Sequence, residues 1–515
     1  MTPPTGRVFI IGAGPGDPGL MTVRGVRLLA EATVVVYDRN TERVLRWARP
    51  DAEMIEAGAP AERDTAQDAL SMLVAEKARD GHIVARVKWG DPFVFDSGAK
   101  EALFLHEQGV PFEVVPGIPA AMGMSAYAGV PLTYPGAGDA LVLVRGQEDE
   151  SGRLAELDWQ ALARVDGTLA CFAGARMVPA ILQRLLDHGA APDTPGALIY
   201  HGTTPTQRTV TGTLRELLDH TAAAIDPNAA LLILGAVTGL RNHLRWFDER
   251  PLFGRRIVVT RSPEQADDLV DRLESLGAQA ISAPTFRMAS ADDPEAVDRA
   301  AASVDDFQWV VFEAASAVTR FLGALSRGPR DIRAFGAVRV CAIGPSTADR
   351  LIAAGIKPDV VVAEVGAESI GDAIADRAPV AGQRVLIVRP DHVRATIGDD
   401  LERRGAHVVD LVAYRTAAAS PDSPAAQHIY RLLLENRVDA VTFTSPTAVR
   451  RFAGLIGEEQ AADLLNTTIV AAIGPVTAAA ARALGVRDPL VPDAYSVEGL
   501  VRLLTEQFRS SQLPV

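Results

Sequence analysis

Short apolar runs alternate along this chain with longer segments in which apolar residues recur at helical spacing. Residues 8–11, 34–37 and 83–87 are rich in Val and Ile, which favours β-strands. Residues 65–80 carry apolar side chains three and four positions apart, which predicts an amphipathic helix. Because this alternation continues to the end of the chain, we predict an α/β fold in which helices cover largely parallel sheets.

The same pattern predicts a domain boundary near residue 250. An apolar strand at 231–235 and a short helix end just before it, and a new strand begins at 256–261. We therefore expect two domains of similar size, residues 1–250 and 251–515. A chain of 515 residues has room for about three or four domains of ordinary size, so further division is expected.

The second half contains two extended segments, 283–287 and 411–416, each preceded by a helix that ends in LGA or RGA. The simplest topology makes these segments a two-stranded bridge between two lobes. Residues 255–287 and 418–510 then form one lobe, and residues 290–412 form the other.

A repeated pattern supports this division. The run FEAASAV at 312–318, which we interpret as strand-like, precedes CAIGPSTA at 341–348, and FTSPTAV at 443–449 precedes AIGPVTA at 472–478. From Phe312 to Gly344 is 32 positions, and from Phe443 to Gly474 is 31. Matched spacing indicates one structural unit used twice, and two copies suggest two similar lobes with a cleft between them.

Each copy offers a strand, a turn that bears hydroxyl groups and the start of a helix. Backbone N–H groups at a helix N-terminus are free to bind an anion, and the helix dipole favours negative charge there. Taken singly, these Ser and Thr residues are better explained as plain helix caps. Their occurrence in two matched copies favours an anion-binding cleft.

Composition narrows the function classes. The net charge of −14 argues against sequence-independent nucleic-acid binding, which needs basic surfaces. The two cysteines, Cys171 and Cys341, are far apart and the nine histidines are scattered, so we predict neither a disulfide framework nor a metal site. We find no signal peptide and no apolar run long enough to span a membrane, and we therefore expect a cytoplasmic protein.

Four motifs of the second half occur in the order and spacing of one enzyme family. They are VVTR (258–261), AYRT (413–416), TFTSP (442–446) and IGPVTA (473–478). Together they resemble uroporphyrinogen III synthase over about residues 255–505. The resemblance implies two flavodoxin-like lobes joined by a two-stranded ladder. It also implies closure of hydroxymethylbilane to uroporphyrinogen III with inversion of the last pyrrole ring, without a metal or an organic cofactor.

The same resemblance implies roles for four residues of this chain. Tyr414 would assist departure of the substrate's hydroxyl group as a proton donor, although a buried Tyr with a satisfied hydroxyl is the alternative. Thr347, Ser445 and Thr477 would bind the substrate, whose carboxylates would meet hydroxyl and backbone N–H groups in the cleft. The first copy departs from the family's pattern, because EAA at 313–315 replaces Thr-Ser-x and Ser316 stands where Asn is common.

The first half opens with GAGPG at 12–16, directly after a strand. This segment does not meet the dinucleotide-binding pattern G-x-G-x-x-G. It is followed, in order, by VVVYDR (34–39), KWGDPF (88–93), VVPGI (114–118) and AYAGVPLT (126–133). The series resembles uroporphyrinogen III C-methyltransferase over about residues 6–248.

That resemblance implies transfer of methyl groups from S-adenosylmethionine to two ring carbons of uroporphyrinogen III, which gives precorrin-2. The cofactor would lie between two α/β subdomains, and this half of the chain would form a homodimer. Asp38 matches the family's functional aspartate and is a candidate catalytic residue. The residues carried over as cofactor contacts are Pro15, Gly90, Asp91, Val94, Ala120 and Gly202.

Several positions depart from the methyltransferase pattern, and they cluster at the expected chemistry. Trp89 stands where the family has Gly, DSGAKE at 96–101 and TYP at 133–135 lose arginines, FAG at 172–174 replaces Tyr-Met-Gly, and Ala59 stands where a lysine is expected. Arginine and lysine are natural partners for a substrate with many carboxylates. Two interpretations stay open: a working methyltransferase with altered residues, or a degenerate relative kept for binding, folding, assembly or regulation.

We predict a fusion protein of tetrapyrrole biosynthesis, because the two implied reactions are consecutive. Its expected partners are hydroxymethylbilane and uroporphyrinogen III, with neither nucleic acid nor membrane involved. The alternative from another class is a protein in which both halves bind tetrapyrroles or S-adenosylmethionine without turnover.

Overall fold

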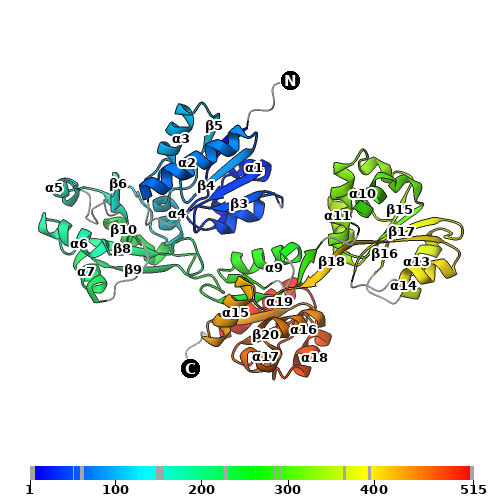
Figure 1. Cartoon of the computed structure of the whole chain (residues 1–515). Coiled ribbons are helices and arrows are strands. Elements are labelled where there is room, and N and C mark those ends of the chain that lie inside the picture. Colours follow the sequence, from blue (N-terminus) through cyan, green and yellow to red (C-terminus); the bar gives the residue numbers. More distant parts are fainter. Residues whose placement is uncertain are drawn as a thin grey trace. The chain divides into compact units, whose positions relative to one another are not determined.

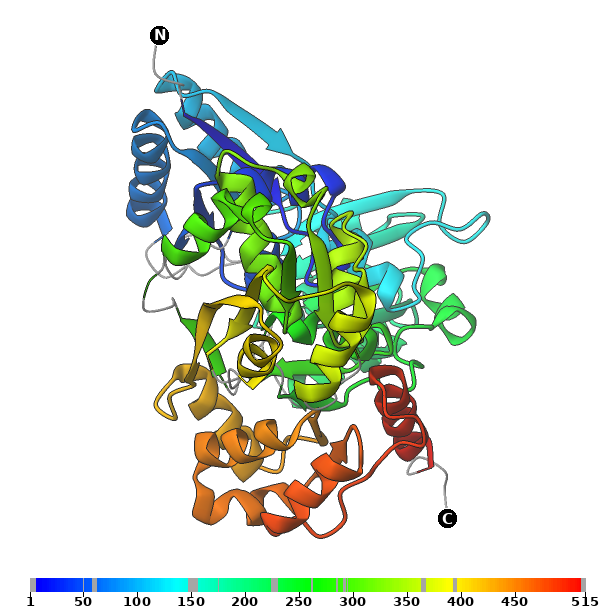
Figure 2. The same cartoon turned by 90° about the vertical axis from the view of Figure 1, so that its right-hand side faces the viewer.

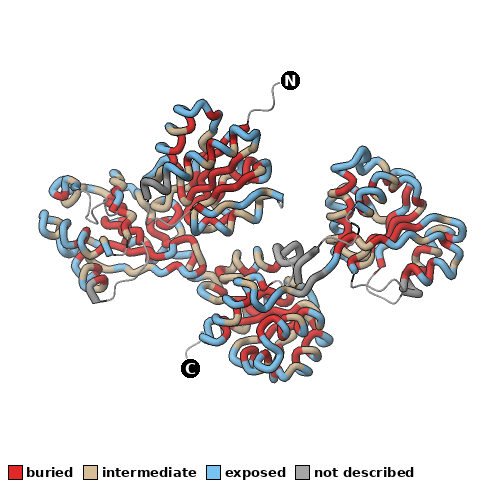
Figure 3. Tube along the Cα trace, in the orientation of Figure 1, coloured by how far each residue is buried: buried red, intermediate tan, exposed pale blue. Residues whose placement is uncertain are grey.

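The computed structural model describes residues 6–49, 51–57, 63–146, 156–174, 176–223, 230–260, 263–283, 286–289, 293, 295–362, 367–391 and 396–510. The chain divides into two compact units. The first comprises Met1–Arg255, Leu273–Gln279 and Phe508–Val515, and the second comprises Arg256–Arg272 and Ala280–Gln507. In both units the buried residues follow the strands of the sheets, and exposed residues lie on the outer sides of the helices (Figure 3).

The first unit begins with a parallel sheet in the strand order β3-β2-β4-β1-β5. Its strands are β1 (Arg7–Gly12), β2 (Val34–Tyr37), β3 (Glu53–Glu56), β4 (Ile83–Lys88) and β5 (Phe112–Val115). Helix α1 (Val23–Glu31) packs on one face, and α2 (Arg63–Arg79) and α3 (Gly98–Glu107) pack on the other (Figures 1 and 2). Strands that are covered on both faces have apolar residues at consecutive positions, and this explains why such strands could be predicted from the sequence.

A second sheet follows in the order β6-β7-β10-β8-β9. Its strands are β6 (Leu141–Gly146), β7 (Thr168–Ala173), β8 (Pro195–Tyr200), β9 (Arg208–Thr213) and β10 (Ala230–Leu234). Helices α5 (Trp159–Ala163), α6 (Val178–Asp187) and α7 (Leu214–Ala223) share one core cluster with it, and α4 (Ala120–Tyr127) packs in another. A 3-10 helix, Ala236–Leu240, and α8 (Arg241–Leu244) come after β10.

The expectation of largely parallel sheets is wrong for this second sheet. Only β6 and β7 pair in parallel, whereas β7–β10, β10–β8 and β8–β9 are antiparallel. The connection between β8 and β9, residues 201–207, explains part of the difference. It is too short to hold the crossover helix that a parallel pair needs, so the chain must return antiparallel.

The second unit contains a four-stranded sheet in the order β12-β11-β19-β20. Its strands are β11 (Arg256–Val259), β12 (Gln279–Ser282), β19 (Ala440–Phe443) and β20 (Ile469–Ala472), of which β11–β19 and β19–β20 pair in parallel. Helix α9 (Pro263–Ser275) follows β11, and α15 (Pro424–Leu434) precedes β19. Helices α16 (Pro446–Ile456) and α17 (Glu458–Leu465) follow β19, and α18 (Pro475–Ala483) and α19 (Val497–Ser510) follow β20. Apolar side chains of α15, α16, α17 and α18 form the core that covers this sheet.

The other sheet of this unit has the order β13-β18-β17-β14-β15-β16. Its strands are β13 (Phe286–Ala289), β14 (Trp309–Phe312), β15 (Arg339–Ile343), β16 (Val360–Val362), β17 (Arg384–Pro390) and β18 (His407–Ala418). Helices α10 (Glu295–Ala302), α11 (Ala315–Arg327) and α12 (Pro345–Ala353) pack on one face, and α13 (Ala367–Arg377) and α14 (Thr396–Arg403) on the other. Every pair in this sheet is parallel except β13 with β18.

The antiparallel pairing of β13 with β18 confirms the predicted two-stranded ladder. Its register runs from Phe286 opposite Ala418 to Ala289 opposite Arg415. The predicted strand-like run at 312–318 is wrong, because β14 ends at Phe312 and α11 begins at Ala315. Ala317, Val318 and Phe321 are buried at helical spacing, and this periodicity outweighs the short apolar run.

Within the part of the chain that the structure describes, each helix is too short or too polar to span a bilayer.

Three glycines let the backbones of the first sheet approach closely. A Cβ atom added at Gly12 would lie 2.5 Å from the backbone nitrogen of Gly117, and one added at Gly117 would overlap the carbonyl oxygen of Gly90. These residues lie at the end of β1, just after β4 and just after β5. The close approach therefore draws the carboxyl ends of three strands together.

Replacement of Gly117 by Ala is expected to lower the free energy of unfolding by about 1–3 kcal/mol, the usual cost of overpacking. Thermal unfolding followed by circular dichroism measures the loss as a lower Tm. Gly239→Ala is the matched control, because an added Cβ atom there meets no atom within 4 Å. An unchanged Tm for Gly117→Ala would contradict the close backbone approach.

Candidate functional site

The turn after β1 and the turn after β4 are joined by backbone hydrogen bonds. Gly14 and Gly90 each donate an N–H to the other's carbonyl oxygen, at 3.2 and 2.9 Å. A Cβ atom added at Gly90 would meet only the backbone nitrogen of Ala120, at 3.8 Å. Pro15 packs against α4, because a Cβ atom added at Gly123 of that helix would lie 2.5 Å from the Cγ atom of Pro15. The structure thus brings the predicted cofactor residues Pro15, Gly90 and Ala120 together.

The turn after β8 joins this group. A Cβ atom added at Gly202 would overlap the side chain of Met124 in α4. The hydroxyl of Thr203 accepts a hydrogen bond from the backbone N–H of Asp17 at 3.1 Å. His201 and Thr203 have φ values of 48° and 67°, a left-handed conformation that costs non-glycine residues energy. Such strain persists where surrounding contacts fix the backbone, and it is concentrated here beside Gly202.

Asp91 has a structural task in this turn. Its Oδ1 accepts the N–H of Phe93 at 2.8 Å, and its Oδ2 accepts the N–H of Gly117 at 3.0 Å. The carboxylate therefore ties the turn after β4 to the turn after β5. Val94, the neighbouring predicted cofactor contact, is 37 % exposed and lies at the surface.

Asp38, at the end of β2, belongs to a buried ion network. Its carboxylate lies 2.5 Å from Nη2 of Arg86 and 3.8 Å from Nζ of Lys88. Glu101 contacts the same two cations, at 2.9 Å from Arg86 and 2.8 Å from Lys88. Asp96 lies 3.1 Å from Lys88. Three carboxylates thus surround two cations, which are only 2 % and 1 % exposed.

The network fixes the charge of its members. Burial by itself would raise the pKa of Glu101, but attraction to Arg86 and Lys88 outweighs burial and lowers the pKa to about 2. Burial likewise favours a neutral Arg86, yet Glu101 and Asp38 hold its pKa above the usual value. For Asp96 burial wins over the attraction of Lys88, and the pKa is raised.

Asp38 was predicted from the sequence, but its partners Arg86 and Lys88 were not. Arg86 and Lys88 are two positions apart in β4, so both point to the same side of a buried strand. Two cations in such a buried strand require buried anions nearby. The positions of Arg86 and Lys88 in the sequence could therefore have predicted a buried ion network. Which anions they meet depends on the tertiary fold.

Two of the residues that depart from the methyltransferase pattern contact each other. The ring centroids of Trp89, after β4, and Phe172, in β7, are 5.2 Å apart. Both side chains are partly exposed. The contact joins the two sheets of the first unit beside Gly90. Ala59, the other departure of interest, lies outside the described residues.

In the second unit, Tyr414 is 4 % exposed and packs in the core cluster of the six-stranded sheet. Its hydroxyl lies 2.5 Å from the Oγ of Ser316, in the first turn of α11. In the sequence, Ser316 stands out only as a departure from a family pattern. The structure makes it a hydrogen-bonding partner of the predicted catalytic residue.

The repeated turns have matching burial. Thr347 and Thr477 each lie in the first turn of a helix, α12 or α18, and are 1 % and 4 % exposed. In both copies the two residues before the Thr are exposed, and the Gly before them is buried. Ser445 is the N-cap of α16 and accepts the N–H of Ala448 at 3.1 Å. Thr347 and Thr477 thus lie at the starts of equivalent helices on two sheets, and Ser445 caps an earlier helix of the second copy.

Two other residues of the quoted motifs hold strands together. The hydroxyl of Thr260 donates to the carbonyl of Thr442 at 2.8 Å, and the hydroxyl of Thr442 donates to the carbonyl of Val258 at 3.1 Å. Both threonines are 1 % exposed. They therefore stabilise the pairing of β11 with β19. Arg261 lies outside the described residues.

Comparison with known proteins adds independent evidence. The sequence pattern of the tetrapyrrole (corrin/porphyrin) methylases matches residues 7–218, and that of uroporphyrinogen-III synthase HemD matches residues 267–502. A uroporphyrinogen-III C-methyltransferase of Bacillus subtilis is 35% identical over 330 residues, which cover 64% of this chain and 68% of the relative. The chain belongs to the tetrapyrrole methylase family. Behind its methylase domain it carries a uroporphyrinogen-III synthase domain, and its function lies in tetrapyrrole biosynthesis.

One relative matches both domains. A porphyrin biosynthesis protein HemD of Ruminiclostridium josui is 28% identical over 503 residues, which cover 97% of this chain and 98% of the relative. A siroheme synthase of Neisseria meningitidis is 44% identical over 246 residues, about half of each chain. The order of methylase and synthase domains is therefore shared over the whole length of another protein.

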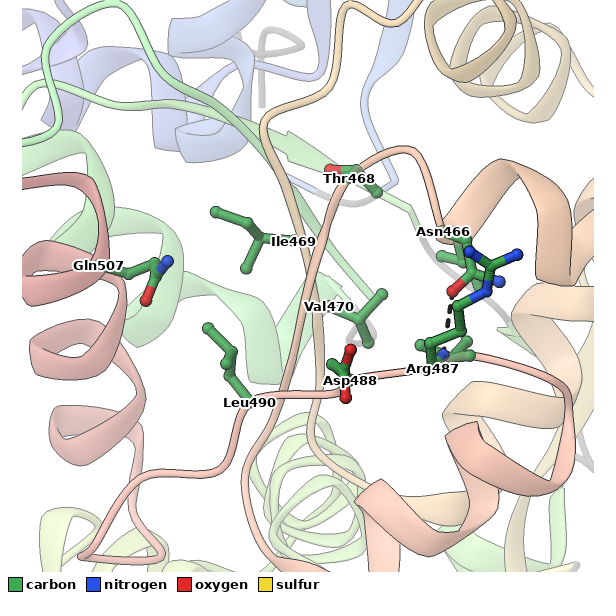
Figure 4. Close-up of a pocket in the computed structure, with 10 residues that line it drawn as sticks. Asn466, Thr468, Ile469, Val470, Arg487, Asp488, Leu490 and Gln507 are labelled. Atoms are coloured by element: carbon green, nitrogen blue, oxygen red, sulfur yellow. Dashed lines mark hydrogen bonds between the residues drawn. The ribbon is translucent and has the colours of Figure 1, made fainter. Parts of the chain in front are cut away.

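A cavity of about 380 Å³ lies in the synthase domain, at the start of β20 (Figure 4). Ile469, the segment 486–490 and Gln507 of α19 contribute to its lining. Asn466, at its edge, accepts the backbone N–H of Arg487 at 3.0 Å. Thr477 follows the opposite, carboxyl end of β20, so this cavity is separate from the predicted substrate-binding residues.

Replacement of Arg86 by Met is expected to lower the free energy of unfolding by about 3–5 kcal/mol, because it leaves Glu101 buried with one cation fewer. Chemical denaturation at pH 7 measures the loss. Arg39→Met is the matched control: Arg39 and Glu56 form an exposed ion pair, and exposed pairs contribute about 0–1 kcal/mol.

The pH dependence of stability gives a second readout. The pKa of Glu101 is lowered from 4.5 to about 2, so its stabilising contribution is present above pH 4.5 and is lost as the pH falls towards 2. Arg86→Met is expected to flatten this acid limb. An acid limb identical to that of the wild type would contradict the network.

Proposed function

We propose that the synthase domain closes hydroxymethylbilane to uroporphyrinogen III with inversion of the last ring. The proposal rests on the repeated unit. In each copy a strand, a turn and the start of a helix follow one another, and the corresponding turn residues are buried or exposed in the same way on the two sheets. The exposed residues of both turns precede free N–H groups at the starts of α12 and α18. Such groups suit the carboxylates of a linear tetrapyrrole.

Thr347, Ser445 and Thr477 would then bind substrate through the helix starts that they form. The task of these turns is to hold the chain folded, so that rearranged closure is faster than simple closure. Tyr414 would assist departure of the hydroxyl group, with its own hydroxyl oriented by Ser316. No step of this scheme requires a metal ion or an organic cofactor.

We propose that the methylase domain binds S-adenosylmethionine at the turns after β1, β4 and β8. The residues fit such a group, because Gly90 has a φ of 71° and open space in front of its Cα, beside Pro15 and Ala120. Pro15, Gly90, Asp91, Val94, Ala120 and Gly202 would hold it. When bound, S-adenosylmethionine supplies an electrophilic methyl group. Asp38 would be the catalytic carboxylate in the methylation of uroporphyrinogen III to precorrin-2, in a domain that pairs as a homodimer in the cytoplasm.

One observation favours a second function for this domain. Trp89 and Phe172 pack beside Gly90, where the family pattern has smaller or different side chains. A domain with this pair can bind the cofactor or a tetrapyrrole without methylation, in a regulatory or scaffold role. Calorimetry and a methylation assay separate the two functions.

Tyr414→Phe is expected to lower the rate of hydroxymethylbilane consumption about 100-fold, the usual contribution of a positioned proton donor. The product is expected to shift towards the unrearranged isomer, because simple closure needs no enzyme. Oxidation to porphyrins and chromatographic separation of the isomers measure both effects.

Tyr430→Phe is the matched control for this variant, since Tyr430 is a partly buried tyrosine whose hydroxyl is likewise hydrogen-bonded, as donor to Gln460 at 2.7 Å. Its rate and isomer ratio are expected to equal those of the wild type. A wild-type protein that yields only the unrearranged isomer would refute the synthase proposal.

Isothermal titration with S-adenosylhomocysteine is expected to show saturable binding to the full chain. Gly90→Ala should weaken binding at least about 10-fold, because its Cβ atom occupies the open space. Gly109→Ala is the matched control, since Gly109 also has a positive φ, 64°, and has no atom near its Cβ position. No heat of binding to the wild type would refute the cofactor proposal, and binding without methylation would favour the second function.

A further inference from the structure

A closed network of four hydrogen bonds joins three segments of the methylase domain that lie far apart in the sequence. The backbone N–H of Asp17, after β1, donates to the hydroxyl of Thr203, after β8, at 3.1 Å. The backbone N–H of Thr203 donates to Oε1 of Gln207 at 2.9 Å. Nε2 of Gln207 donates to the carbonyl of Tyr127, the last residue of α4, at 3.2 Å. The hydroxyl of Tyr127 donates to Oδ2 of Asp17 at 2.7 Å and closes the network.

The network is buried and holds a strained residue. Thr203 and Gln207 are only 1 % and 6 % exposed, and Thr203 keeps a φ of 67° that a β-branched residue rarely adopts. Both carboxylate oxygens of Asp17 are engaged, because Oδ1 accepts the N–H of Gly19 at 2.8 Å. Burial raises the pKa of the Tyr127 hydroxyl, and its hydrogen bond to Asp17 raises the pKa further. The hydroxyl therefore remains a donor at neutral pH.

Aromatic contacts fix the direction of the Tyr127 side chain. Its ring centroid lies 4.7 Å from that of Phe247 and 5.1 Å from that of Trp246, and both of these residues follow α8. Phe247 is 2 % exposed, and Nε1 of Trp246 donates to the carbonyl of Ala126 at 3.0 Å. Such packing holds the aromatic ring in place, so the hydroxyl points to Asp17 without further ordering.

Each segment of the network also supplies one of the proposed cofactor contacts. Pro15 lies in the turn after β1, Gly202 in the turn after β8, and Ala120 at the start of α4. The two turns approach closely, because a Cβ atom added at Gly16 would lie 3.0 Å from the hydroxyl oxygen of Thr203. The network therefore fixes the separation of the three segments that would surround the cofactor.

We propose that Tyr127 is a positioning residue of the methylase domain: its hydroxyl holds Asp17, and with it the turn after β1, at the distance from the turn after β8 that S-adenosylmethionine requires. The inference rests on the cofactor binding proposed above. Tyr127 acts through Asp17 and not by contact with the cofactor. A site whose walls already lie at the bound separation loses no binding free energy to ordering them, so the affinity depends on this hydroxyl.

The test is Tyr127→Phe in the full chain, with isothermal titration by S-adenosylhomocysteine and the Tm of the free protein measured on the same samples. Phe keeps the aromatic ring and its contacts with Phe247 and Trp246 but cannot donate to Asp17. We expect the Kd to rise about 10-fold, because hydrogen bonds to charged groups are among the stronger ones. Tyr430→Phe is the matched control: it removes a hydrogen-bonded hydroxyl in the synthase domain and should leave the Kd unchanged.

A pair of variants at Thr203 tests the same network from its other side. Thr203→Val keeps the shape of the side chain and removes the acceptor for Asp17, whereas Thr203→Ser keeps the hydroxyl. We expect Val to raise the Kd about 10-fold and Ser to keep it within about 2-fold of the wild type. The double variant of Tyr127→Phe with Thr203→Val should bind at most about 3-fold more weakly than either single variant, because each breaks the same network.

The outcomes separate the two proposals. A wild type without saturable binding refutes cofactor binding, and the inference with it. A wild type that binds, together with a Tyr127→Phe variant of equal affinity, refutes the positioning role alone, and a lower Tm of that variant would then show a merely structural hydrogen bond. Effects of the two variants that multiply to about 100-fold also overturn the shared network. If Tyr127→Phe does not fold, the Thr203 pair decides: weak binding by Val alone supports the role, and equal binding by Val and Ser overturns it.

Discussion

The parallel sheet is the constraint on which both proposed sites depend. In a parallel sheet the carboxyl ends of neighbouring strands meet at one edge, and the turns that follow them carry the functional side chains. The proposed residues that follow such strand ends are Asp38 after β2, Gly90 after β4, Thr347 after β15, Ser445 after β19 and Thr477 after β20. Each domain thus gathers distant parts of the sequence by the same geometry. The cavity at the opposite end of β20 lies outside this pattern.

The two domains treat buried charge in opposite ways. In the methylase domain, Asp38 belongs to a network in which Arg86 and Lys88 satisfy the buried carboxylates. Such a network keeps Glu101 charged and the side chains fixed. In the synthase domain, Glu313 is buried without a partner among the described residues, and its pKa is near neutrality. In the first arrangement opposite charges offset the cost of burial, and in the second burial itself raises the pKa of the carboxyl group.

The sequence predicted the elements whose signals are local. Strand β2 was predicted at its observed bounds, and the two-stranded ladder followed from two extended segments of matching context. The repeat predicted equivalent turns at Gly344 and Gly474. The mixed pairing of the second sheet was missed, because the direction of β9 depends on a short connection rather than on residue pattern.

Side-chain partnerships were the least predictable part of the candidate sites. Ser316 and Tyr414 are 98 positions apart, and their contact exists only after β14 and β18 join one sheet. Trp89 and Phe172 likewise come from different sheets of one unit. Both Glu313 and Trp89 were visible in the sequence as departures from family patterns. Their burial and neighbours come from the fold.

The most direct test of the account is a one-pot reaction of the purified full chain. Hydroxymethylbilane and S-adenosylmethionine with a carbon-13 methyl group are the only substrates supplied, and the products are identified by carbon-13 NMR and isomer analysis. The account predicts uroporphyrinogen III when S-adenosylmethionine is left out, and a doubly methylated product that carries the label when it is present. Formation of only the unrearranged, unlabelled isomer under both conditions would contradict it.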